Sequence, residues 1–200
     1  LQGKYPLIYI SFKDVKKFSW ESCYNKTIGL IKNIFKEFLY LADTLNEIDK
    51  EDFFSIAKKQ ATQEDYENSF KFLCELLYKH YGVKPIILID EYDQALITAH
   101  TYGYFKEAMN FYRNFLSTVL KDNEHLERAI LTGILRVAKE SVFSGLNNLK
   151  VDSILKNQFN YFGLSEDEVL EALRYYGRDY EIQEVKEWYN GYTFGKNLVY

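Results

Sequence analysis

Two neighbouring carboxylates, Asp90 and Glu91, follow directly on the apolar run PIILI at residues 85–89. In open α/β sheets, ligands bind beyond the carboxyl ends of the strands, so acids at such an end can meet a ligand. The first acid can hold Mg²⁺, directly or through water, and Mg²⁺ bridges nucleotide phosphates. The second can act as a base toward an attacking water. Loops are polar in general, so the pair alone is also compatible with an ordinary strand end.

A second polar strand end carries Thr132 and Arg136, at and just beyond the apolar run AILTGIL at residues 129–135. A threonine hydroxyl or an arginine at that level could face a γ-phosphate or the attacking water. Arginine suits this role because its guanidinium is permanently charged and forks onto phosphate oxygens. The alternative is a threonine bonded within the sheet and an arginine paired with a neighbouring acid. Together, the two strand ends favour a site for a nucleotide and its metal.

Other catalytic patterns have less support. The three histidines are dispersed, and no H-x₃-H or C-x₂-C spacing typical of zinc sites occurs. No G-x-S-x-G elbow of an α/β-hydrolase occurs either. A metal-dependent hydrolase that uses Asp90, Glu91 and Asp93 remains an alternative, although no histidine or Glu-x-Lys pair accompanies these acids near a strand.

The composition describes a globular protein. Its 200 residues, 47% of them apolar, suit one domain with a small appendage. The net charge of −4 and the absence of a Lys/Arg block give no support to a nucleic-acid-binding face. No apolar run approaches the roughly 20 residues of a membrane span, no secretory leader is visible, and Cys23 and Cys74 have the surroundings of buried free thiols. We therefore expect a cytoplasmic location and no membrane partner.

The elements that must position the acids are strands alternating with long helices. Four apolar runs predict strands, and the run at 85–89 has the non-alternating pattern of a strand covered on both faces. These strands are expected at residues 6–12, 85–89, 129–135 and about 158–162. Strands separated by helices predict an α/β domain with a mainly parallel sheet.

Helix signals lie between these runs. Ser19 can cap a helix that runs through Phe38, and Gly82 can end another with its stripe from Tyr66 to Tyr81. Further helices are expected from Phe105 to Val119, after the capping box that begins at Ser165, and over residues 182–188. We expect turns or loops at residues 46–52 and 100–104 and in the tail WYNGYTFGKNLVY, and no strand after Ser165.

Four segments carry a resemblance: YPLIYISFKDVK, IILIDEYDQAL, LTGILRVAKESVFSGLNNL and EWYNGYTFG. In this order they resemble the bacterial AAA-ATPase-like family, whose members often carry a PD-(D/E)XK nuclease-like domain further along the chain. The resemblance implies a P-loop NTPase core of the additional-strand class over residues 1–164 and the start of a helical lid over residues 165–200. A nucleic-acid partner would then act through such a nuclease-like domain.

The resemblance also implies roles for individual residues. Asp90 and Glu91 match the Walker B pair, Thr132 matches the sensor strand, and Arg136 matches the basic residue after it. The cofactors of the intact protein would be ATP and Mg²⁺, with Asp90 as the metal-binding and nucleotide-binding acid. The segment SGLNN, Ser144 to Asn148, matches a family signature to which we assign no chemical role.

One family feature is missing. A phosphate-binding loop needs G-x-x-x-x-G-K-[ST] before a helix, and the nearest match, Gly191 to Asn197, has the wrong spacing and ends in Asn. In the family this loop and its strand lie upstream of the segment that matches Leu1. We therefore expect an ATPase-core fragment that is inactive alone. The gap or exposed edge left in its sheet should close by a shifted strand or by self-association with another chain. The alternative is a regulatory or interaction module that does not hydrolyse ATP.

A first prediction concerns nucleotide binding by residues 1–200 alone. Without the loop amides that cradle phosphates, isothermal titration with ATP and Mg²⁺ should give a Kd weaker than micromolar and no turnover. A micromolar Kd would contradict the fragment interpretation.

Overall fold

The chain divides into two compact units, Leu1–Asn147 and Asn148–Tyr200. The computed structural model describes residues 3–134, 149–150, 163–189, 191–194 and 197–199, and the two units are treated separately because their relative placement is not determined. The expected fourth strand at 158–162, Arg136 and the segment 144–148 fall outside these residues. The expected boundary between residues 164 and 165 stays a prediction.

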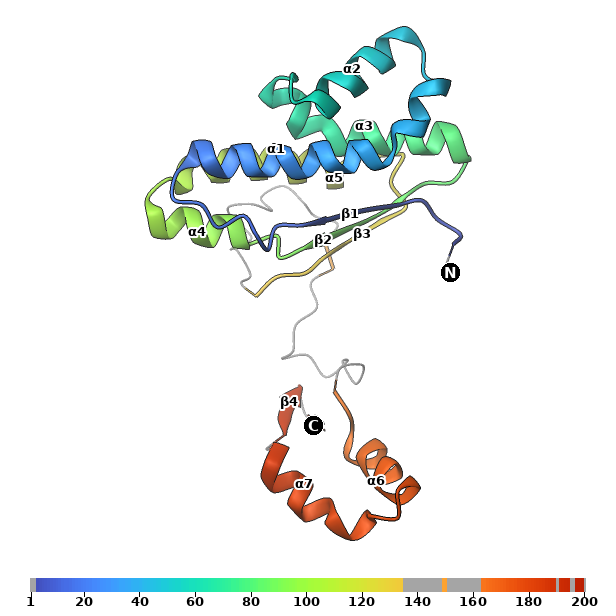
Figure 1. Ribbon diagram of the computed structural model, residues 1–200, viewed down its shortest axis with the longest axis vertical. Helices are drawn as coiled ribbons and strands as arrows, with labels where there is room; N and C mark the ends of the chain where they lie inside the picture. The colour runs from blue at the N-terminus through green and yellow to red at the C-terminus, as the bar shows by residue number, and fades with distance from the viewer. Residues whose placement is uncertain (1–2, 135–148, 151–162, 190, 195–196, 200) are drawn as a thin grey trace. The chain divides into compact units, whose positions relative to one another are not determined.

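The first unit is an α/β layer structure with a three-stranded parallel sheet in the order β1-β2-β3 (Figure 1). Its strands are β1 (Leu7–Ser11), β2 (Ile86–Asp90) and β3 (Arg128–Leu131). The central strand is therefore the one that ends in the candidate acid. Among the described residues, β3 pairs with β2 alone. This agrees with the predicted α/β class and mainly parallel sheet.

Long helices connect the strands and lie on one side of the sheet in Figure 1. They are α1 (Trp20–Glu37), the 3₁₀ turn η1 (Leu39–Thr44), α2 (Glu47–Lys58), α3 (Gln63–Tyr81), α4 (Gln94–Tyr102) and α5 (Phe105–Leu120). As predicted, Ser19 caps α1 by accepting a hydrogen bond from the Ser22 N–H, and Gly82 ends α3 with a left-handed φ of 65°.

The core lies between the sheet and this helical layer. Ile8, Ile10, Ile87 and Ile89 are buried on one face of the sheet. Phe12, which directly follows β1 and is also buried, makes edge-to-face contacts with Tyr112 and Phe115 of α5. Several aromatic side chains of the helices thus serve packing of the core.

The prediction that the strand at 85–89 is covered on both faces is wrong for the described residues. Burial alternates along β2, and the same alternation on β1 leaves Leu7 and Tyr9 about half exposed, at 49% and 54%. Ile130 of β3 is 50% exposed as well. Tyr9, Leu88 and Ile130 are register partners and so share one face. The described helices therefore cover only the opposite face of the sheet.

Two helices occupy segments that the sequence predicted to be turns or loops. Residues 46–52 enter α2 because the Asn46 side chain accepts a hydrogen bond from the Asp49 N–H and so caps the helix. Helix α4 extends to Tyr102, so only Gly103, with a φ of 80°, and Tyr104 separate it from α5. Charged and polar residues in these two segments are compatible with a helix surface as well as with a loop.

The second unit contains α6 (Glu166–Tyr175), the 3₁₀ turn η2 (Asp179–Glu181), α7 (Ile182–Tyr189) and the hairpin strands β4 (Tyr192–Phe194) and β5 (Asn197–Val199). Ser165 and Glu168 form the predicted capping box at α6. The prediction of no strand after Ser165 is wrong, since β4 and β5 pair antiparallel. Residues 192–194 and 197–199 are thus the strands of a hairpin, whereas a phosphate-binding loop precedes a helix.

We predict that Phe12→Ala lowers the free energy of unfolding of the chain by about 3–5 kcal/mol, because it removes a fully buried ring and leaves a cavity. Urea titration followed by circular dichroism measures this change. Ile48→Ala is the control, since Ile48 is 75% exposed and should change stability by less than about 0.5 kcal/mol. Equal effects of the two substitutions would contradict the described core.

Candidate functional site

Three polar side chains converge at the carboxyl end of the sheet. Asp90, the last residue of β2, accepts a hydrogen bond from the Thr132 hydroxyl at its Oδ1 (2.7 Å) and from the Ser11 hydroxyl at its Oδ2 (3.0 Å). Ser11 ends β1 and is the register partner of Asp90, and Thr132 directly follows β3. Each strand flanking β2 thus supplies one hydroxyl to the same carboxylate.

Backbone hydrogen bonds continue past the strand ends and hold this cluster in place. The Phe12 N–H donates to the Asp90 carbonyl (2.9 Å), and the Thr132 N–H donates to the Ile89 carbonyl (2.9 Å). The Tyr92 N–H donates to the Thr132 carbonyl at 3.1 Å, which joins the turn after β2 to the end of β3. Backbone hydrogen bonds between the three strand ends therefore fix the positions of the residues of this cluster.

The surroundings of Asp90 favour its ionised form. The hydrogen bonds from Thr132 and Ser11 lower the pKa of the Asp90 carboxyl, and the Glu91 backbone N–H and the charge of Lys13 act in the same direction. Burial of the carboxyl opposes this shift. Near neutral pH, Asp90 is therefore an ionised acceptor with oxygens available to a cation.

Glu91 and Lys13 lie beside this cluster, and the charge of Lys13 acts on Asp90. Glu91 adopts a left-handed backbone conformation with a φ of 51°, which is unusual for a residue with a long side chain. Lys13 is exposed, and its backbone N–H donates to the Ser11 hydroxyl at 3.3 Å. A carboxylate and an ammonium group are thus available next to Asp90.

Gly133 allows two segments of the site to approach closely. A Cβ atom at this position would lie 2.6 Å from Cε1 of Tyr92 and 2.8 Å from Oδ1 of Asp93. Tyr92 and Asp93 are both buried, so neither can easily move away. Only glycine fits between Thr132 and the turn that follows β2.

Of the predicted site residues, the structure brings Asp90 and Thr132 into direct contact and places Glu91 next in the chain. Arg136 and Ser144 to Asn148 fall outside the described residues. Ser11 and Lys13 were missed by the sequence prediction. A signal was present, since Ser11 follows the apolar residues of its strand just as Asp90 does.

The described residues contain no group of three or more His, Cys, Asp or Glu side chains that could hold a metal ion. None of their helices is long and apolar enough to cross a membrane.

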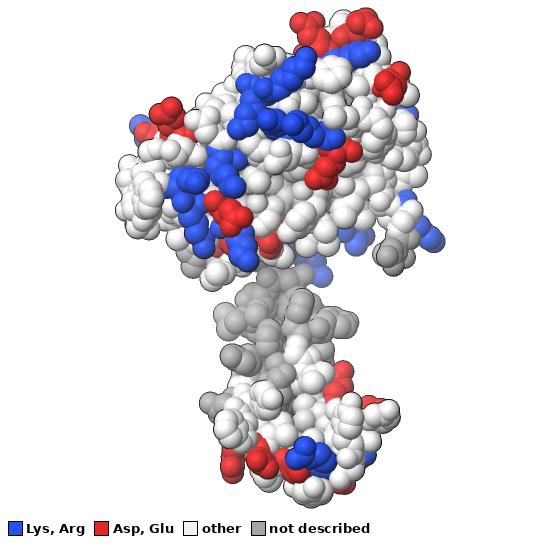
Figure 2. Space-filling model, viewed as in Figure 1, with Lys and Arg blue, Asp and Glu red and all other residues white. Residues whose placement is uncertain are grey.

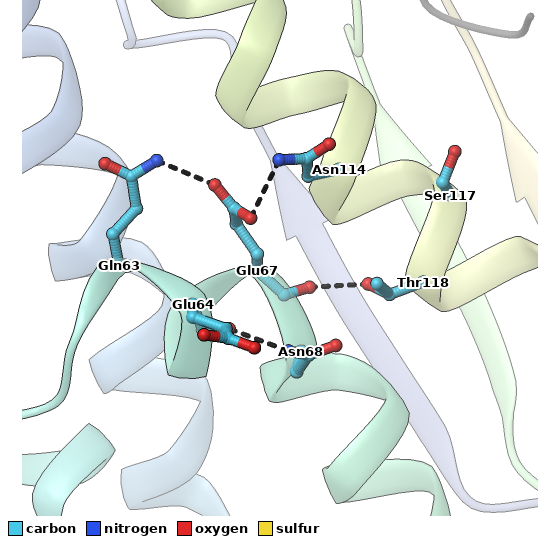
Figure 3. A pocket seen from close by; sticks show the side chains of 7 residues that line it. All are labelled: Gln63, Glu64, Glu67, Asn68, Asn114, Ser117 and Thr118. Carbon is cyan, nitrogen blue, oxygen red and sulfur yellow. Dashed lines mark hydrogen bonds between the residues drawn. The ribbon is translucent and has the colours of Figure 1, made fainter.

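A separate polar cavity of about 540 Å³ lies between α3 and α5 and includes none of the strand-end residues (Figure 3). The buried Glu67 carboxylate lies at its centre and accepts hydrogen bonds from Gln63 Nε2 (2.7 Å) and Asn114 Nδ2 (3.0 Å). The Thr118 hydroxyl donates to the Glu67 carbonyl at 2.6 Å. These bonds join two helices of the core layer, which accounts for the polar residues without a ligand.

Basic and acidic side chains are interspersed on the face of the first unit that Figure 2 shows. The chain as a whole carries a net charge of −4. This view therefore offers no broad basic surface of the kind that binds a nucleic-acid backbone.

The model of the AAA-ATPase-like family, described as predicted AAA-ATPase, matches residues 1–143 of the chain. This chain belongs to the AAA-ATPase-like family. The match includes β1, β2 and β3 and therefore all three residues of the hydrogen-bonded cluster. The family identified from the four sequence segments is confirmed.

A curated relative comes from Azotobacter chroococcum mcd 1, where it is named an uncharacterized protein in the vnfD 5′ region. It is 29% identical over 140 residues, which are 70% of this chain and 27% of the relative. The chain thus spans about a quarter of that relative's length. No solved structure matches the chain.

We predict that Gly133→Ala lowers the free energy of unfolding by about 1–3 kcal/mol, because its Cβ would overlap the Tyr92 ring and the Asp93 carboxylate. Urea titration followed by circular dichroism provides the measurement.

Gly29→Ala is the matched control for that substitution. Its Cβ would meet only the flexible end of Lys59, 3.1 Å away. Because alanine favours a helix interior over glycine by up to about 1 kcal/mol, this variant should be as stable as the parent chain or more so. A Gly133→Ala chain of unchanged stability would disprove the close approach at the site.

Proposed function

We propose that the chain contributes the metal-binding and water-activating part of an ATP-binding and ATP-hydrolysing AAA-like core. Family membership supports the ATPase class. The observation that carries the proposal is the Asp90 carboxylate at the end of the central parallel strand, bonded by Ser11 and Thr132 from both sides. This is the position where ligands of open α/β sheets bind.

The residues present fit magnesium. The cluster offers carboxylate and hydroxyl oxygens alone, which are the donors that Mg²⁺ prefers, and Mg²⁺ commonly takes one or two carboxylates together with substrate phosphates. Asp90 would hold the ion, directly or through water, and Thr132 keeps the carboxylate in place. The bound ion would neutralise charge on the nucleotide phosphates.

Glu91 and Arg136 take the remaining roles in this proposal. The Glu91 carboxylate, which has no hydrogen-bonding or ionic partner among the described residues, would orient the attacking water and accept its proton. Arg136 would stabilise phosphate charge through its guanidinium. The amides that cradle the phosphates would come from a part of the protein outside these 200 residues, and the segment from Ser165 would begin a lid.

A second candidate function, an interaction module without hydrolysis, is favoured by the open face of the sheet. Leu7, Tyr9 and Ile130 expose about half of their surface there, and exposed apolar patches of this kind mark contact surfaces. Such a module would keep the fold and the Asp90 cluster but would show no turnover that depends on Asp90 or Glu91.

We predict that Glu91→Gln in the natural gene product that contains this chain lowers the kcat for ATP by about 10²- to 10⁴-fold with little change in ATP affinity, because it removes the base alone. Asp90→Asn should weaken the binding of Mg²⁺–ATP, since it removes the charge that holds the metal. Phosphate-release kinetics and nucleotide titration measure the two effects.

Asp43→Asn is the control for both variants, because Asp43 is exposed and lies in η1. It should behave as the parent protein does. Turnover that survives both Asp90→Asn and Glu91→Gln would contradict the proposed roles. A gene product without any turnover, and with unchanged partner binding in both variants, would favour the interaction module.

A further inference from the structure

The Ser11 hydroxyl takes part in two hydrogen bonds. It donates to Oδ2 of Asp90 at 3.0 Å and accepts from the Lys13 backbone N–H at 3.3 Å. We propose that Ser11 is a positioning residue, which holds the Asp90 carboxylate in the orientation that binds the metal–nucleotide complex. This inference rests on the proposed function and names a residue outside the Walker B pair and the sensor strand.

Two anchors, the hydroxyls of Ser11 and Thr132, determine the orientation of the Asp90 carboxylate. The terminal torsion of an aspartate side chain has a broad energy profile, so a single hydrogen bond from Thr132 to Oδ1 would leave the carboxylate free to swing about that bond. Ser11 holds the other oxygen from the opposite strand. The plane of the carboxylate is thereby fixed between β1 and β3.

The two anchors leave room for a ligand. Each oxygen of an ionised carboxylate accepts about two hydrogen bonds or metal contacts, and among the described residues each Asp90 oxygen has one side-chain hydroxyl partner. The Glu91 backbone N–H also bonds to this carboxylate, so about one acceptor direction remains for a cation or for water bound to it. Ser11 fixes where that direction points.

The bond to Lys13 adds a second consequence. Because the Ser11 hydroxyl accepts from the Lys13 N–H, it also holds the first residues of the turn that leaves β1. The charge of Lys13 acts on Asp90, so this turn brings a cation to the edge of the site. A substitution that removes the hydroxyl releases the carboxylate and the turn together.

Ser11 contributes little to the core, which makes the substitution informative. Its neighbours Ile10 and Phe12 are buried on the helical side of the sheet, whereas Ser11 is only half-buried and lies on the face with Tyr9. Ser11→Ala should therefore fold like the parent protein. Circular dichroism and the thermal midpoint verify this for each variant.

The test uses the natural gene product that contains this chain, with Mn²⁺ and a non-hydrolysable ATP analogue as probes. Electron paramagnetic resonance measures the Kd of Mn²⁺ in the ternary complex, and steady-state kinetics give the KM and kcat for Mg²⁺–ATP. Because the lost bond is to a charged group, Ser11→Ala should raise the Mn²⁺ Kd and the KM by about tenfold. The kcat at saturation should change by less than about twofold, since Glu91 is untouched.

Two variants separate positioning from a general structural effect. Ser11→Thr keeps the hydroxyl and should restore the Mn²⁺ Kd to within about twofold of the parent value, since the bond to the carboxylate is retained. Ser117→Ala removes a hydroxyl at the separate cavity between α3 and α5 and should leave both constants unchanged.

Contrary outcomes are distinguishable. If Asp90→Asn weakens Mn²⁺ binding but Ser11→Ala does not, the role of Ser11 is disproved and the proposed function stands. If Ser11→Thr is as impaired as Ser11→Ala, or Ser117→Ala is equally impaired, the hydroxyl at position 11 is not the cause. If Asp90→Asn has no effect on Mn²⁺ binding, the proposed function itself fails.

Discussion

The hydrogen bonds that join Asp90 to Ser11 and Thr132 depend on the register of three parallel strands. Side chains on a strand alternate between faces, so a slip of one residue would turn Asp90 to the opposite side of the sheet. The register is set elsewhere, by the isoleucines that the helices bury on the other face. Packing in the core thus determines which side chains meet at the strand ends.

The same alternation links the site to the open face of the sheet. Ser11 follows Tyr9 at a spacing of two, and Asp90 follows Leu88 in the same way, so the polar cluster continues an apolar surface. Apolar residues on both sides are typical of parallel strands covered by helices. The first unit therefore has one face covered by its own helices and one that carries the Asp90 cluster.

Local signals predicted much of the fold. Ser19, Gly82 and the pair Ser165 and Glu168 mark helix ends where the structure has them, because capping depends on neighbouring residues only. Asn46 is a cap of the same type, but its run of charged residues resembled a turn. At the start of α4, Asp93 is a residue type that favours N-caps, but its side chain makes no capping hydrogen bond.

The site was predictable in part for a related reason. Adjacent acids after an apolar strand identify Asp90, and the end of the next strand identifies Thr132. The contact of Ser11 with Asp90 spans 79 residues and depends on which strands are neighbours and in which register. A single sequence does not supply that information. The exposure of Leu7 and Tyr9 was missed for the same reason, because periodicity cannot show which face of a strand the helices leave open.

The left-handed backbone at Glu91, with a φ of 51°, opposes the stability of the fold to the presence of a carboxylate at this position. A non-glycine residue in this region carries a strain on the order of 1 kcal/mol or more, and glycine would adopt the same conformation without it. Selection for thermal tolerance alone would therefore favour glycine at this position and discard the carboxylate. Glu91 therefore keeps a carboxylate at the end of β2 at the expense of backbone stability.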